Sequence, residues 1–118
     1  MTAQGHPRAI FRRALERDNL VLADMTAREL GRLTLDEALS LLFLYAEKEP
    51  AKYERAALRW FGRYVTEGKG VSLLKAHLAL AALAELRAGE REAAAKLLTE
   101  LARRQAGSDA VGVGMRGS

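Results

Sequence analysis

Few residues of this chain have the types and spacing that catalysis or metal binding requires. The two histidines, His6 and His77, lie far apart, and the chain has neither a cysteine nor an HExxH spacing to complete a zinc site. No serine lies in the G-x-S-x-G pattern of a nucleophile elbow. The GKG segment at 68–70 fits a turn that ends a helix better than a phosphate-binding loop. We therefore predict no enzymatic activity, no metal and no cofactor, and we infer no small-molecule substrate.

The strongest candidate for chemistry is a row of basic residues in the segment 51–66. At about 100° per residue, four basic side chains fall within about 80° of one another on a helix; they are Lys52, Arg55, Arg59 and Arg63. Like charges four residues apart destabilise a helix by a few tenths of a kcal/mol, so the row needs compensation. Tyr53, Trp60 and Tyr64 border the row, on the side of an expected core made by Ala57, Leu58, Phe61 and Val65.

Two interpretations of this basic row remain open. In the first, glutamates of neighbouring helices, such as Glu29 or Glu47, pair with the arginines while the rings seal a helix interface. In the second, the row binds an acidic protein partner or a nucleic-acid backbone, since arginine forks bind carboxylate or phosphate and rings stack on bases. The second interpretation predicts the partner-binding residues Lys52, Arg55, Arg59, Trp60, Arg63 and Tyr64.

Composition and charge set the class of protein. A chain of 118 residues that is 49% hydrophobic is long enough for one domain with its own core. The net charge of +4 arises from 19 basic and 15 acidic residues that are interleaved, so charge alone does not identify a nucleic-acid binder. A second basic cluster has only Glu16 in opposition and consists of Arg8, Arg12, Arg13 and Arg17. With no cysteine, no signal peptide and no apolar run long enough for a membrane span, we expect a cytoplasmic protein.

The apolar periodicity predicts six helices and no strand. The start and stop signals are Pro7, Asn19, Gly31, the Thr34–Glu37 capping box, Pro50 and Ser72. The predicted helices span residues 7–17, 20–30, 35 to just before Pro50, 51–66, 73–88 and 90–104. Residues 1–6 are predicted to be a flexible N-terminus and residues 105–118 a flexible Gly-rich segment, with a single helical domain over residues 7–104.

Two of these helices, beginning at Leu35 and Leu73, are apolar nearly all round, so we expect the other four to pack around them. Two such helices in so short a chain favour self-association as well as burial. Links of about two to six residues make successive helices antiparallel. The sequence thus predicts an all-α fold of three helical hairpins, arranged as a compact bundle or as a short stack resembling repeat proteins.

The chain does not fit the pattern of a DNA-binding helix-turn-helix motif. With Gly31 as the turn glycine, the recognition helix would need apolar residues near positions 37 and 40, which are Glu37 and Ser40.

The last two predicted helices resemble a tetratricopeptide repeat. With Gly89 at the turn, four residues fall where that family places its packing residues, namely Leu78, Ala82, Ala94 and Leu98. The chain departs from the family at Glu85, where an aromatic residue is usual, and no 34-residue period recurs. As a whole, the chain also resembles short all-helical proteins of GC-rich actinobacteria, a resemblance that implies no known activity.

These observations favour a non-catalytic, helical protein-interaction module that binds a protein partner or self-associates. The alternative is a nucleic-acid-binding accessory protein that uses the basic row.

Overall fold

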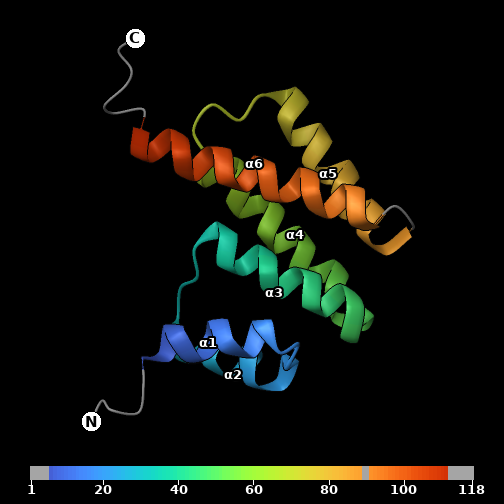
Figure 1. The fold of residues 1–118 in the computed structure, drawn as a ribbon. Helices are drawn as coiled ribbons and strands as arrows, with labels where there is room; N and C mark the ends of the chain where they lie inside the picture. Colours follow the sequence, from blue (N-terminus) through green and yellow to red (C-terminus); the bar gives the residue numbers. More distant parts are fainter. Residues whose placement is uncertain (1–5, 89–90, 112–118) are drawn as a thin grey trace.

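The computed structural model describes residues 6–88 and 91–111 and is all-α in these residues (Figure 1). Six helices follow one another along the chain: α1 (Pro7–Glu16), α2 (Leu20–Leu30), α3 (Leu35–Lys48), α4 (Pro50–Glu67), α5 (Leu73–Ala88) and α6 (Arg91–Val111). The predicted fold class is confirmed.

The helix starts are fixed by the side chains that the sequence indicates. The backbone N–H of Leu22 donates to Asn19 Oδ1 at 3.1 Å, and the N–H of Lys75 donates to Ser72 Oγ at 3.1 Å. At the start of α3, the capping box is complete in both directions, between Thr34 and Glu37. These bonds satisfy backbone donors that have no partner inside the helix.

The six helices form three hairpins that stack in chain order and make two layers. The pairs α1–α2, α3–α4 and α5–α6 are each closely packed. Figure 1 shows the three hairpins one above another, with α1, α3 and α6 each in front of its partner. The shortest dimension of the molecule is 21 Å, which matches two helices of about 10 Å diameter each. In such a stack only the middle hairpin, α3–α4, has another hairpin on both sides.

Helix α3 is the centre of the fold, as its sequence predicts. It contacts every other helix. Its residues Leu39, Leu42 and Ala46 belong to a larger hydrophobic cluster shared with α4, α5 and α6, whereas Leu41 and Leu44 belong to a smaller cluster shared with α1 and α2. Helix α3 therefore contributes side chains to both clusters and lies between them.

Helix α5 differs from its expected place. The sequence predicts that it is buried like α3, and this prediction is wrong for its outer side, where Leu73 is 90% exposed and Leu74 is 67% exposed. The physical reason is the position of α5 at the end of the stack. Its core residues are Ala79, Ala82, Leu83 and Leu86, which cover only one side of the helix.

Helix α6 continues beyond the predicted end at Arg104, to Val111. One glycine costs a helix about 1 kcal/mol, so Gly107 alone does not end α6. Residues 1–5 and 112–118 of the predicted terminal segments lie outside the described residues.

Candidate interaction surface

The basic row on α4 is half neutralised by glutamates of its own neighbourhood. Lys52 Nζ lies 3.7 Å from Glu49 Oε2, three residues away. Arg63 holds Glu67 with two bonds, from Nε at 2.7 Å and from Nη2 at 3.1 Å. The expected partners Glu29 and Glu47 have no part in these ion pairs.

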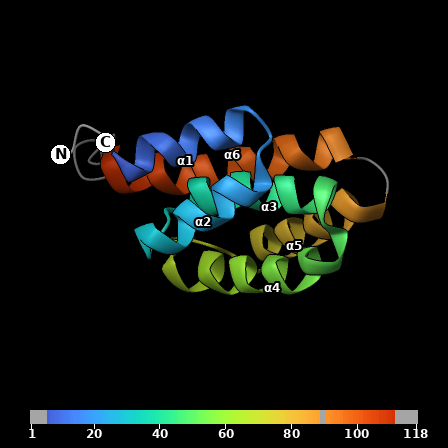
Figure 2. The ribbon, with the colours of Figure 1, turned by 90° about the horizontal axis from the view of Figure 1, so that it is seen from below.

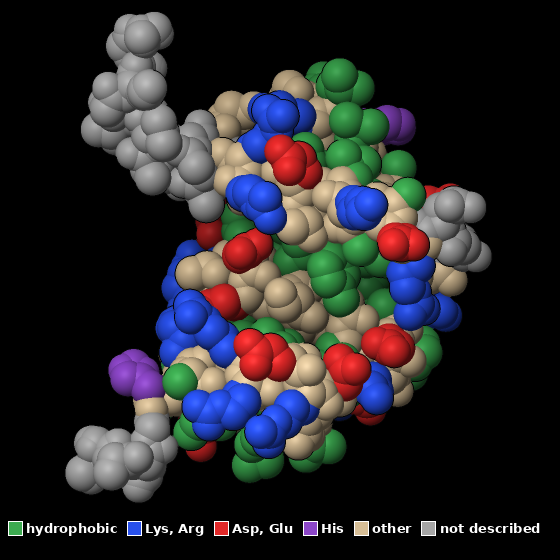
Figure 3. Space-filling model, in the orientation of Figure 1, with side chains coloured by type: hydrophobic (Ala, Val, Ile, Leu, Met, Phe, Trp, Pro, Cys, Tyr) green, Lys and Arg blue, Asp and Glu red, His purple; other side chains and the backbone are tan. Residues whose placement is uncertain are grey.

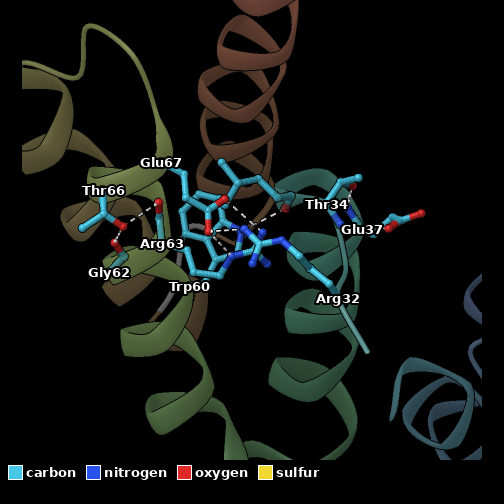
Figure 4. A network of polar contacts seen from close by, with 9 residues as sticks. Arg32, Thr34, Glu37, Trp60, Gly62, Arg63, Thr66 and Glu67 are labelled. Carbon is cyan, nitrogen blue, oxygen red and sulfur yellow. Dashed lines mark hydrogen bonds and ion pairs between the residues drawn. The ribbon is translucent and has the colours of Figure 1, made fainter. Parts of the chain in front are cut away.

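Glu67 also joins α4 to the segment between α2 and α3. Arg32 Nη2 lies 2.9 Å from Glu67 Oε2, so one carboxylate receives two guanidinium groups (Figure 4). The hydrogen bond from Arg63 is the main reason that the pKa of Glu67 lies below its ordinary value. Arg63 is therefore committed to a contact within the fold.

Arg55 and Arg59 are the members of the row that remain available to a partner. Both are exposed, and no ion pair or side-chain hydrogen bond within the described part of the chain involves either one. Burial raises the pKa of the Tyr45 hydroxyl to about 12, and the positive charge of nearby Arg59 opposes this rise. Arg55 and Arg59 therefore form the basic surface that α4 presents to solvent.

Trp60 and Tyr64 do not border that surface, because α4 turns a different side to the core. Trp60 is 3% exposed and Tyr64 is fully buried, whereas Leu58 is 58% exposed and Val65 is 37% exposed. The prediction that Leu58 and Val65 lie in the core is wrong. Neither ring is on the surface for a partner to stack upon.

The packing of the rings explains this rotation of α4. Trp60 and Tyr64 stack with centroids 5.4 Å apart and planes 6° from parallel. The indole N–H of Trp60 donates to the Leu35 carbonyl at 2.9 Å (Figure 4). Tyr53, two turns before Trp60 on the same side, donates its hydroxyl to the Leu83 carbonyl at 2.7 Å. Aromatic rings bury more apolar area than Leu58 and Val65 would, so this side of α4 packs inward.

The structure also has an exposed apolar surface on α5, whose location was not predicted from the sequence. On α5, residues within about 100° of one another form what we term the α5 face: Leu73, Leu74, His77, Ala81 and Ala84, all exposed. In Figure 3, hydrophobic side chains gather over α5 at the top of the molecule, while charged side chains of both signs are interspersed elsewhere in this view.

A groove lies beside the α5 face, between α5 and α4. We term it the α4–α5 groove; its volume is about 370 Å³, and it is lined by Tyr53, Glu54, Ala57, Leu58, Leu80, Leu83, Ala84 and Arg87. Leu58 and Leu80, both about half exposed, stand at its borders. The lining is apolar along most of its length, with Glu54 and Arg87 as its charged members.

The second basic cluster is separate from the first. Arg8 pairs with Glu37 of α3, whereas Arg12, Arg13 and Arg17 are exposed. Because α1 and α4 belong to opposite layers (Figure 2), the two clusters do not form one surface.

The histidines and carboxylates form no apparent metal site in the described residues. His6 precedes α1 and His77 lies on the α5 face, both exposed. Within residues 6–88 and 91–111, no group of three or more histidine, aspartate or glutamate side chains is arranged to hold a metal ion. Nor does any helix in these residues have the length and apolar character needed to span a membrane.

Comparison of the chain with protein-family models, with curated proteins and with solved structures finds no match.

Proposed function

We propose that this protein is a non-catalytic, helical protein-interaction module that binds through the α5 face and the α4–α5 groove. The exposure of leucines on α5 is the observation that carries the proposal. Leu73, Leu74 and Leu80 are 90%, 67% and 45% exposed on one helix. Contiguous apolar patches of this kind on a soluble domain mark binding sites, since their exposure to water is unfavourable.

The shape of the surface indicates the type of ligand. An apolar groove between two helices, with a charged residue of each sign in its lining, is suited to the apolar side of another helix. Leu58 and Leu80 at the borders of the groove supply contacts on both sides of such a helix.

Capture from the native cell tests this proposal. A tagged wild-type chain is compared with Leu80→Glu, which places a charge at the border of the groove, and with Val21→Glu as control. Val21 is an apolar residue, 72% exposed, on α2 and away from α5. We expect at least one protein to be retained by the wild type and the control and lost with Leu80→Glu. Equal retention by all three chains would contradict the proposal.

A second candidate function, binding of a nucleic-acid backbone, is favoured by Arg55 and Arg59 alone. Titration against DNA and RNA at two salt concentrations tests it, because phosphate contacts weaken as salt rises. In this case Arg59→Glu weakens binding, and Glu67→Gln strengthens it by releasing Arg63 from its ion pair. Binding that neither substitution changes would exclude this function.

A further inference from the structure

We infer that the α5 face binds the α5 face of a second copy of this chain, with the two helices antiparallel about a twofold axis. This inference rests on the proposed function and names its partner. Two properties of the face support a second copy: its charge, and the order of its large and small residues. A third property, its area, sets the expected strength of the dimer.

The first property is the absence of charge near the centre of the face. In a symmetric dimer each residue near the twofold axis lies beside its own copy, so a charged residue there would be repelled. The midpoint of the α5 face lies between His77 and Ala81, and none of its five residues is Lys, Arg, Asp or Glu. By contrast, an exposed helix of a monomer normally carries charged residues on the side opposite the core.

The second property is the order of residue sizes along α5. The first turn carries Leu73 and Leu74, whereas the third and fourth turns carry Ala81 and Ala84. An antiparallel partner places Leu74 over the small side chain of the other copy's Ala84, and the same contact repeats on the other side of the axis. A parallel partner would oppose leucine to leucine and leave space at the alanines.

The third property is the area. A helix of 16 residues is about 24 Å long and about 10 Å wide, so the outer side of α5 has an outline of roughly 240 Å². This outline is smaller than the roughly 800 Å² per partner of a stable interface, so we expect a weak dimer that forms at high protein concentration. Leu58 of α4, which lines the α4–α5 groove with Leu80, adds apolar surface beside the C-terminal half of α5.

The first experiment measures the mass of the purified full chain in solution. Sedimentation velocity, run from low micromolar to several hundred micromolar concentration, is expected to show a shift from one chain to two. Leu74→Glu is expected to remain monomeric over this range, or to associate at least ten-fold more weakly. A wild-type chain that stays monomeric at the highest concentration would overturn the inference.

The matched control for this variant is Val21→Glu. Both residues lie in the first turn of a helix, where an added carboxylate interacts favourably with the helix dipole. Their exposed fractions are similar, 67% for Leu74 and 72% for Val21. Neither change is expected to disturb folding, which circular dichroism checks. Val21→Glu should dimerise like the wild type, and equal weakening by both substitutions would count against the α5 face.

Cross-linking tests the orientation of the two helices. The chain has no cysteine, so a single one can be introduced at either of two positions. Ala81→Cys lies near the proposed axis and should be linked to its copy by a short bis-maleimide reagent. Leu73→Cys should not be, because antiparallel helices place its two copies roughly 18 Å apart along the axis. Efficient linking of Leu73→Cys would overturn the antiparallel arrangement.

The same data distinguish this inference from the proposed function. A monomeric wild-type chain that still captures another protein through Leu80 excludes the second copy and leaves the interaction module in place. A dimer that Leu74→Glu separates, with no other protein captured, identifies the second copy as the ligand of the face.

Discussion

Tyr64 of α4 is a buried residue whose hydroxyl has no hydrogen-bond partner in the described part of the chain. Burial raises its pKa above the ordinary value for tyrosine. Tyr53 is equally well buried, but its hydroxyl donates to the Leu83 carbonyl. The two tyrosines are therefore equally buried and differ in whether the hydroxyl has a hydrogen-bond partner, so comparing them isolates the contribution of that hydrogen bond to stability.

Replacing each tyrosine by phenylalanine should have opposite effects. Tyr64→Phe removes an unpaired polar group and is expected to raise the free energy of unfolding by about 1 kcal/mol. Tyr53→Phe removes a satisfied hydrogen bond and is expected to lower it by about 1 kcal/mol. Urea denaturation of both variants measures these changes, and a loss of stability in Tyr64→Phe would show that its hydroxyl is paired after all.

The tyrosines also predict how stability depends on alkaline pH. Burial raises the pKa of Tyr53 to about 12, and burial together with the hydrogen bond to Asp24 does the same for Tyr45. An unfolded tyrosine has a pKa of about 10, so above this pH the unfolded chain releases protons that the folded chain retains. The stability from the neutral hydroxyls is complete below about pH 10 and is lost as the pH rises toward 12.

Denaturation at about pH 9 and about pH 11 measures this loss, because only the second value lies above the unfolded pKa. The fall in stability should be smaller in Tyr53→Phe than in the wild type. An equal fall in both would mean that Tyr53 does not contribute.

At the scale of the element, α3 and α5 are both apolar nearly all round in sequence but have different surroundings. Leu39 of α3 is 1% exposed and Leu73 of α5 is 90% exposed. Leu39→Ala should lower the free energy of unfolding by about 3 kcal/mol, since it leaves a cavity. Leu73→Ala should change it by less than about 0.5 kcal/mol in dilute solution, as expected of a surface position. Chemical denaturation at low micromolar concentration compares them, and comparable losses would place Leu73 in a packed environment.

The elements themselves were largely predictable because their limits are set locally. Asn19, Thr34, Glu37 and Ser72 act within one turn of the chain, and the structure confirms each cap. The rotation of α4 was not predictable in the same way. Both of its sides are apolar, one through Leu58 and Val65 and the other through its aromatic rings, and the choice depends on what the neighbouring helices offer.

The candidate surface was harder to predict than the helices. A helix that is apolar nearly all round is expected to be buried. The sequence has two such helices, α3 and α5, and does not indicate which one lies in the middle of the stack. That choice follows from the order of the hairpins in the stack. Two nearly all-apolar helices in so short a chain favoured self-association as well as burial, but nothing in the sequence located the uncovered surface on α5.

At the scale of the whole molecule, the two hydrophobic clusters predict unequal local stability. The hairpin α1–α2 is held by the smaller cluster, chiefly Phe11, Ala14 and Ala23 against Leu41 and Leu44 of α3. The other three helices share the larger cluster with α3. We expect backbone amides of α1 and α2 to exchange with solvent at a lower free energy than those of α3 and α4.

Native-state hydrogen exchange followed by mass spectrometry measures this difference. Leu41→Ala should accelerate exchange in α1 and α2 more than in α4, because Leu41 belongs to the smaller cluster. Uniform acceleration over all helices would show that the molecule opens as one unit.

The exposed leucines of α5, at the end of the stack, have a consequence for heating experiments. When a second copy covers them, unfolding also separates two molecules, and mass action then makes the midpoint temperature rise with protein concentration. Thermal midpoints of dilute and concentrated samples would therefore differ for the wild-type chain, and would coincide once Leu74 is replaced by glutamate.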